Sequence, residues 1–126
     1  MANIPENLKY TSTHEWVKID GNIAVVGITD HAQHELSDIV FVELPQVGRK
    51  VKAGEACAVV ESHKTASDIY SPLSGEIVET NQKVTSDMGL INTAPYGDGW
   101  LFKIKISKPD EIQSLLSAVD YSKITG

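Results

Sequence analysis

Lys64 is the residue whose surroundings most clearly indicate chemistry. It stands in the run Glu61-Ser62-His63-Lys64-Thr65-Ala66-Ser67-Asp68, with strand-like stretches on both sides. Gly54-Glu55 and Gly75-Glu76 flank this part of the chain. The layout predicts a β-hairpin with the lysine at its tip, where two rigid strands hold the amine clear of the body.

An exposed lysine amine is a cation at neutral pH, because its reference pKa is about 10.4. Formation of an amide on that nitrogen would remove the charge and lengthen the side chain. Most lysines in turns are only solvated charges, which is the expectation for the other basic residues. The case for Lys64 therefore depends on the sequence around it.

Other chemistry-bearing residues indicate no site of their own. His31, His34 and Glu35 lie close together, but they lack the order and spacing of a two-histidine zinc helix, so solvated or capping roles are expected and no metal is predicted. No glycine-rich phosphate loop and no Ser/His/Asp arrangement occurs. Cys57 is the single cysteine and lies in an apolar run, which predicts a buried thiol and excludes an intrachain disulfide.

The composition bounds the class of protein. The chain has 126 residues and 41% hydrophobic residues, which predicts one soluble domain over residues 1–126. A net charge of −6 disfavours nucleic-acid binding. No apolar run approaches the roughly 20 residues that span a bilayer. The N-terminal residues lack the pattern of a secretory signal, so a cytoplasmic protein is expected, although a processed mitochondrial form would look similar.

The elements that must position Lys64 are mostly short strands. Strands are predicted at 16–19, 23–28, 39–44, 56–61, 67–70, 76–80 and 101–106, with a turn at Asp20-Gly21-Asn22. Thr29-Asp30 is expected to cap a helix that reaches about Leu36. Pro109 is expected to begin a helix that ends near Leu116, and a second helix is expected over 118–123. This pattern indicates a mainly β sandwich or flattened barrel with a helical tail, with Trp16 and Trp100 in or against its core.

The run around Lys64 resembles the lipoylation motif of the glycine cleavage H proteins. Four further blocks resemble this family in the same order: Thr13-His14-Glu15-Trp16, Gly27-Ile28-Thr29-Asp30, Phe41-Val42-Glu43-Leu44-Pro45, and Asn92 with Pro95-Tyr96-Gly97-Asp98-Gly99-Trp100. The departures are His63 where valine is usual, Ser37 where glycine is common, and Met88-Gly89 where a proline is often found. His63 adjoins the lysine, so it bears on recognition by the attaching enzyme.

The resemblance implies a lipoyl/biotinyl-like flattened barrel-sandwich hybrid with short helices. It implies that lipoic acid is amide-linked to Lys64 and that Glu61, Ser67 and Asp68 serve recognition of the tip. It also implies a cleft for the loaded arm near Thr13 and Glu15, with Asp68 close by, where a carboxylate could hold the ammonium end. A surface acid at Glu15 and a turn-stabilising Asp68 are the competing interpretations.

The implied function is that of a carrier without catalytic activity. Its partners would be a PLP-dependent glycine decarboxylase, a folate-dependent aminomethyltransferase, dihydrolipoamide dehydrogenase and a lipoate-attaching enzyme. A monomer is the simplest expectation for such a shuttle. The alternatives are a lipoyl donor or a lipoyl domain that serves a different 2-oxoacid dehydrogenase-type complex. Biotinyl domains differ at the tip, and neither those nor other lipoyl domains have the His14-Glu15-Trp16 block or the helical tail.

Overall fold

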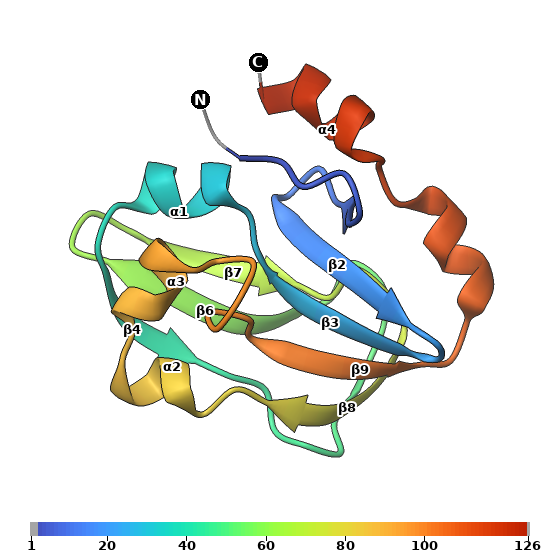
Figure 1. Cartoon of the computed structure of the whole chain (residues 1–126). Coiled ribbons are helices and arrows are strands. Elements are labelled where there is room, and N and C mark those ends of the chain that lie inside the picture. Colours follow the sequence, from blue (N-terminus) through green and yellow to red (C-terminus); the bar gives the residue numbers. More distant parts are fainter. Residues whose placement is uncertain (1–2, 126) are drawn as a thin grey trace.

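Two antiparallel sheets form the body of the protein in the computed structural model, which describes residues 3–125 (Figure 1). The larger sheet has the order β1-β2-β3-β9-β8-β5, and the smaller one has the order β4-β6-β7. The strands are β1 (Lys9–Tyr10), β2 (Glu15–Asp20), β3 (Ile23–Ile28), β4 (Ile39–Glu43), β5 (Lys50–Val51), β6 (Ala56–Ser62), β7 (Ala66–Tyr70), β8 (Gly75–Thr80) and β9 (Phe102–Ile106). The predicted mainly β fold is confirmed, and its two sheets do not close into a barrel.

The main hydrophobic core lies between these sheets. Val26 and Ile104 enter it from the larger sheet, and Val60 and Ile69 enter it from the smaller one. Cys57 belongs to the same core, as its apolar neighbours predicted. Trp16 is buried and Trp100 half-buried in a second cluster beside β1. Each Å² of apolar surface that these clusters remove from water stabilises the fold by about 25 cal/mol.

Two turns show why the strands meet in these registers. Gly21 has a φ of +62°, which lets Asp20 pair with Ile23 across the two-residue turn between β2 and β3. The hairpin β6–β7 pairs Glu61 with Ala66 and ends in the four residues 62–65. Lys64 therefore lies at a hairpin tip, at the far end of the smaller sheet from the turn that enters β8 (Figure 1).

Short helices cover the edges of the sheets. They are α1 (Asp30–Leu36), α2 (Lys83–Ser86), α3 (Gly89–Thr93), the 3₁₀ helix η1 (Pro109–Ser114) and α4 (Ala118–Thr125). Thr29 caps α1 as predicted, because its hydroxyl accepts a hydrogen bond from the amide of Ala32. No helix within residues 3–125 is long and apolar enough to cross a membrane.

The helix expected from Pro109 is present as a 3₁₀ helix, and it ends two residues before the predicted end near Leu116. It stops at Ser114, because Leu115 is extended and Leu116 exchanges two backbone hydrogen bonds with Tyr10 of β1. Glu111 also anchors this helix, accepting hydrogen bonds from the amide and hydroxyl of Ser74. Tertiary contacts thus shorten it by two residues, and the next helix, α4, runs two residues further than predicted.

Candidate functional site

The hairpin tip presents Lys64 on a closed turn. The amide of Ser62 donates to the carbonyl of Thr65 at 2.8 Å, and the hydroxyl of Ser62 accepts hydrogen bonds from the amides of Lys64 and Thr65. The Lys64 side chain is exposed, and its Nζ donates to the backbone carbonyl of Glu35 at 2.8 Å. The amine therefore lies beside the end of α1, open to a modifying enzyme.

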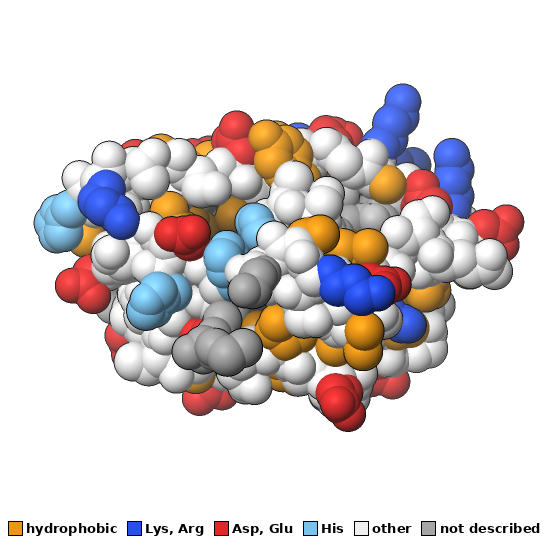
Figure 2. All heavy atoms as spheres, turned by 90° about the horizontal axis from the view of Figure 1, so that it is seen from above, with side chains coloured by type: hydrophobic (Ala, Val, Ile, Leu, Met, Phe, Trp, Pro, Cys, Tyr) orange, Lys and Arg blue, Asp and Glu red, His pale blue; other side chains and the backbone are white. Residues whose placement is uncertain are grey.

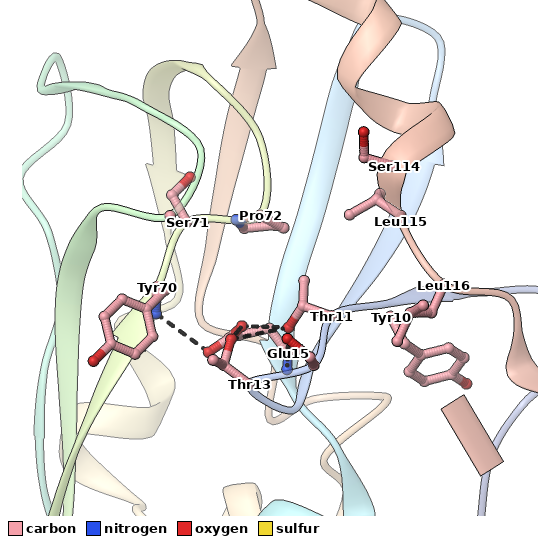
Figure 3. Close-up of a pocket in the computed structure, with 12 residues that line it drawn as sticks. Tyr10, Thr11, Thr13, Glu15, Tyr70, Ser71, Pro72, Ser114, Leu115 and Leu116 are labelled. Atoms are coloured by element: carbon pink, nitrogen blue, oxygen red, sulfur yellow. Dashed lines mark hydrogen bonds between the residues drawn. The ribbon is translucent and has the colours of Figure 1, made fainter. Parts of the chain in front are cut away.

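A cavity of about 480 Å³, here called the larger cavity, lies between the start of β2, the end of β7 and the segment that joins η1 to α4 (Figure 3). One part of its wall is apolar and comprises Tyr10, Pro72, Leu115 and Leu116. The other part carries hydroxyl groups and a carboxylate, from Thr11, Ser12, Thr13, Glu15, Ser71 and Ser114. The cavity therefore combines an apolar lining with one concentrated polar spot.

Glu15 is that polar spot. The residue is only 1% exposed, and its Oε1 accepts hydrogen bonds of 2.5 Å from the hydroxyls of both Thr11 and Thr13. Its Oε2 accepts the amide of Tyr70 at 3.2 Å. Burial raises the pKa of this carboxyl, and these hydrogen bonds oppose the rise. Every partner is a donor, which is the set that an ionised carboxylate requires.

A second cavity of about 220 Å³, the smaller cavity, lies between α1 and β7. His14 and His31 form part of its wall, with ring centroids 4.7 Å apart. Figure 2 shows histidine side chains and acidic side chains gathered on the face of the molecule to which α1 belongs. Burial first, and then the neighbouring His31, lower the pKa of His14, while Glu35 raises it.

Shared residues link the hairpin tip and the two cavities in series. Glu35 accepts the hydrogen bond from Lys64 and lines the smaller cavity, whose other wall includes Ser67 and Ile69 of β7. Thr13 lines both cavities. We call this series, from Lys64 through the smaller cavity to Glu15, the arm groove. It follows β7 from the tip to Tyr70, at about 3.3 Å per residue.

The structure brings some of the predicted residues together and leaves others apart. Thr13 and Glu15 are in direct contact, and Ser67 lines the arm groove rather than the outer surface of the tip. Glu61 is half-buried and pairs with Ala66 directly before the tip. Asp68 has an exposed side chain and lines neither cavity, so it is not placed beside Glu15.

Sequence reasoning missed several residues of this site. The hydroxyl-rich run Thr11-Ser12-Thr13 before Glu15 was a usable signal, because a buried carboxylate needs nearby donors. Leu115, Leu116 and Tyr121 gave no such signal. They come from the far end of the chain, and only the fold brings them to the start of β2.

The cysteine and the metal-ligand types of side chain form no second candidate centre among residues 3–125. The thiol of Cys57 is buried, and desolvation raises its pKa to about 12, which keeps it protonated and unreactive. Among residues 3–125, no group of histidine, cysteine and acidic side chains is arranged to hold a metal ion. His31 Nε2 instead lies 3.7 Å from a carboxylate oxygen of Glu35 on the same face of α1.

Comparison with known proteins shows the family to which this chain is related. The family model described as glycine cleavage H-protein matches residues 8–126. The glycine cleavage system H protein of Symbiobacterium thermophilum is 53% identical over 99% of this chain and 98% of its own length. The mitochondrial glycine cleavage system H protein of Oryza sativa subsp. indica is 53% identical over 97% of this chain and 74% of its own length.

A solved structure of a glycine cleavage system H protein has the same backbone fold as this chain. The crystal structure of a glycine cleavage system H protein from Mycobacterium marinum superposes with a TM-score of 0.88. It is 44% identical in sequence, and the match covers 95% of this chain and 97% of that one. A family model over nearly the whole length, relatives above 50% identity and a shared fold all point the same way. The chain therefore belongs to the glycine cleavage H-protein family, a family of carrier components rather than of enzymes.

Proposed function

We propose that Lys64 carries a lipoyl group through an amide bond and that the chain is the mobile carrier of the glycine cleavage system. In this role it takes the aminomethyl group from the PLP-dependent glycine decarboxylase to the folate-dependent aminomethyltransferase. Dihydrolipoamide dehydrogenase then reoxidises the carrier. The observation that supports this most is the arm groove, which joins an exposed lysine on a closed hairpin tip to a buried, hydrogen-bonded carboxylate.

The groove has the chemical character that this group requires. The alkyl chain and ring of a lipoyl arm are apolar and suit the wall formed by Tyr10, Pro72 and Leu116. The amino end of the cargo is a cation, and Glu15 offers a carboxylate whose desolvation is not yet offset by a positive charge. A cation beside Glu15 would offset that cost.

When bound, the lipoyl group would supply a disulfide, of which one sulfur would take the one-carbon unit as a thioether while the other became a thiol, so that the dithiol would remain once the unit had been passed on. The protein side chains supply placement. Glu15 holds the ammonium end, Thr11 and Thr13 hold the carboxylate of Glu15 in one orientation, and the walls of the larger cavity keep water from the labile carbon–sulfur bond. No side chain of the groove needs to donate or remove a proton at the reacting carbon.

Recognition of the tip is a separate task from protection of the arm. We propose that the lipoate-attaching enzyme reads Glu61 and Asp68, whose side chains flank the tip on β6 and β7. Ser67 lies toward α1 and serves the groove side of the same hairpin. His63 is exposed next to Lys64 and falls within the surface that this enzyme would contact.

The attachment is tested by intact mass after incubation with lipoate, ATP and a lipoate-attaching enzyme. Wild type is expected to gain one lipoyl group, and Lys64→Arg, which keeps the positive charge, is expected to gain none. Lys83→Arg, on an exposed helix away from the tip, is the matched control and is expected to behave as wild type. Equal gain in wild type and Lys64→Arg would overturn the assignment.

The carrier role is tested with the lipoylated protein and the isolated glycine decarboxylase. Release of CO₂ from glycine is expected to depend on the lipoylated chain and to stop with Lys64→Arg. A lipoylated chain that supports no release, yet passes its lipoyl group to 2-oxoacid dehydrogenase domains, would favour the donor function instead.

A further inference from the structure

The phenol of Tyr121 connects three segments that are far apart in the sequence. Its oxygen lies 2.7 Å from Nδ1 of His14 and 2.7 Å from Oγ1 of Thr29. His14 belongs to the turn that carries Glu15, Thr29 caps α1, and Tyr121 is on α4. We propose that Tyr121 is a positioning residue of the arm groove, which holds the Thr11–Glu15 turn against the start of α1 and so keeps Glu15 enclosed. The link to arm protection rests on the proposed function.

The turn needs such support because its backbone is strained. His14 has a φ of +74°, in the left-handed region that residues other than glycine rarely adopt. Its amide donates to the carbonyl of Thr11, and its carbonyl accepts from the amide of Thr29. The hydrogen bond between Nδ1 of His14 and the phenol of Tyr121 is the third contact that holds this residue in place. The strained turn aims Glu15 into the larger cavity.

The ring of Tyr121 supports a second wall of the same cavity. It stacks on Tyr10 with a centroid distance of 4.7 Å and an interplanar angle of 9°. Tyr10 lines the larger cavity. Tyr121 itself is fully buried and lines neither cavity, so it acts through its neighbours.

The hydrogen-bond partners fix the direction of this chain of contacts. Thr29 Oγ1 accepts the amide of Ala32 and has Tyr121 as its other partner among residues 3–125. In the arrangement that gives each of these hydroxyl protons an acceptor, Thr29 donates to Tyr121 and Tyr121 donates its one proton to Nδ1 of His14. This is the arrangement that we propose, and in it His14 is neutral with its proton on Nε2. Burial keeps Tyr121 protonated by raising its pKa to about 12.

Protonation of His14 would reverse this order of donors. The imidazolium would donate from Nδ1, Tyr121 would donate to Thr29, and the Thr29 hydroxyl would have no acceptor. The groups that face His14 are His31 and Glu35 of α1 and Tyr121 of α4. The ordering of the groove is therefore expected to weaken as the solution is acidified through the pKa of His14.

The first test uses the protein without lipoate, so it does not depend on the proposed function. Nitrogen-15 NMR of wild type is expected to show His14 as the neutral Nε2–H tautomer. In Tyr121→Phe, which keeps the ring stack, the acceptor signature at Nδ1 is expected to disappear. Amide exchange across residues 11–15 is expected to rise roughly fivefold, the effect of losing one hydrogen bond, with β8 and β9 amides changed less. Ser122→Ala, on the exposed side of α4, is the matched control.

Either of two results would overturn the proposal. One is a His14 in wild type that is protonated at Nδ1, and the other is unchanged exchange across residues 11–15 in Tyr121→Phe. The second test uses lipoylated protein that carries the aminomethyl group, and faster loss of this group from Tyr121→Phe is expected. If wild type accepts lipoate and both proteins lose the group at the same rate, the positioning role fails although the carrier function stands.

Discussion

At the scale of single residues, the buried carboxylate of Glu15 is the most informative feature of the site. Two threonine hydroxyls and one backbone amide satisfy its carboxylate, but none of these partners carries a positive charge. This lack of a charged partner is the basis of the proposed role of Glu15 toward a cationic cargo. The hydroxyl-rich sequence before Glu15 gave a signal for this arrangement, whereas the exposed position of Asp68 could not be read from the sequence, because the resemblance placed both acids in the same cleft.

Raising the pH from 4 to 8 is expected to destabilise wild type relative to Glu15→Gln in the protein without lipoate. The pKa of Glu15 is raised in the folded state, so folding is most favourable when the carboxyl is protonated. The favourable contribution of the protonated carboxyl to the free energy of unfolding is therefore complete below pH 4.5, the ordinary pKa of the group. This contribution is lost as the pH rises through the raised pKa of Glu15. Urea unfolding of both proteins from pH 4 to pH 8 measures this difference. Parallel stability curves would contradict it.

The same substitution is expected to weaken protection of the loaded arm. A neutral amide cannot pair with an ammonium group as a carboxylate does, and a charged hydrogen bond contributes about 1.5–3 kcal/mol. Loss of the aminomethyl group is therefore expected to be roughly tenfold faster in Glu15→Gln. Asp68→Asn, which removes an exposed carboxylate outside both cavities, is expected to match wild type. An unchanged rate in Glu15→Gln would remove Glu15 from this role.

At the scale of elements, strands with clear alternation were predictable and very short elements were not. The strands at β2, β3 and β6 carry enough apolar residues to indicate their position: β3 has the predicted bounds, β2 is one residue longer at each end, and β6 is one residue longer at its C-terminal end. β1 and β5 have two residues each, and α2 and α3 have four and five. Such segments have no measurable periodicity, because their pairing partners and not their own residues order them.

Gly75 tests how closely two strands of the larger sheet approach. A Cβ at this position would lie 2.1 Å from the carbonyl oxygen of Lys105 and 2.5 Å from a methyl group of Ile104. Since one of these atoms is backbone, β8 would have to shift away from β9. Gly75→Ala is therefore expected to lower the free energy of unfolding by about 2 kcal/mol.

The control for this prediction is Gly97→Ala. The nearest atom to a Cβ at Gly97 lies 3.8 Å away, which is an ordinary contact, and Gly97 has no positive φ. This variant is expected to change the free energy of unfolding by less than about 0.5 kcal/mol. Urea unfolding of the two variants measures the contrast, and equal stability of both would show that β8 adjusts without strain.

At the scale of the whole molecule, the sequence indicated the class of fold but not the walls of the site. Alternation and turn residues predict a mainly β chain, and the order of its blocks indicates the family. The larger cavity, however, needs β1, the end of β7 and the segment before α4 in one place. Two backbone hydrogen bonds between Tyr10 and Leu116 join segments from opposite ends of the chain. A contact between residues so far apart in the sequence produces no local sequence pattern.

The predicted single domain leads to an expectation about unfolding. The buried residues fall into three clusters, but neighbouring strands contribute to all of them: Val26 to the core between the sheets, Trp16 to the cluster with α4, and Val17 and Ala24 to the third. Loss of β2 or β3 from one cluster therefore removes support from the others.

We accordingly expect the full chain to unfold in one cooperative transition. Tryptophan fluorescence reports the cluster that contains Trp16 and Trp100, and far-ultraviolet circular dichroism reports both sheets. The two signals are expected to give the same midpoint in urea. An earlier fluorescence transition would mean that β1, α4 and their cluster detach first. In that case the arm groove would open below the global unfolding free energy, because Tyr10 and Leu116 form its wall.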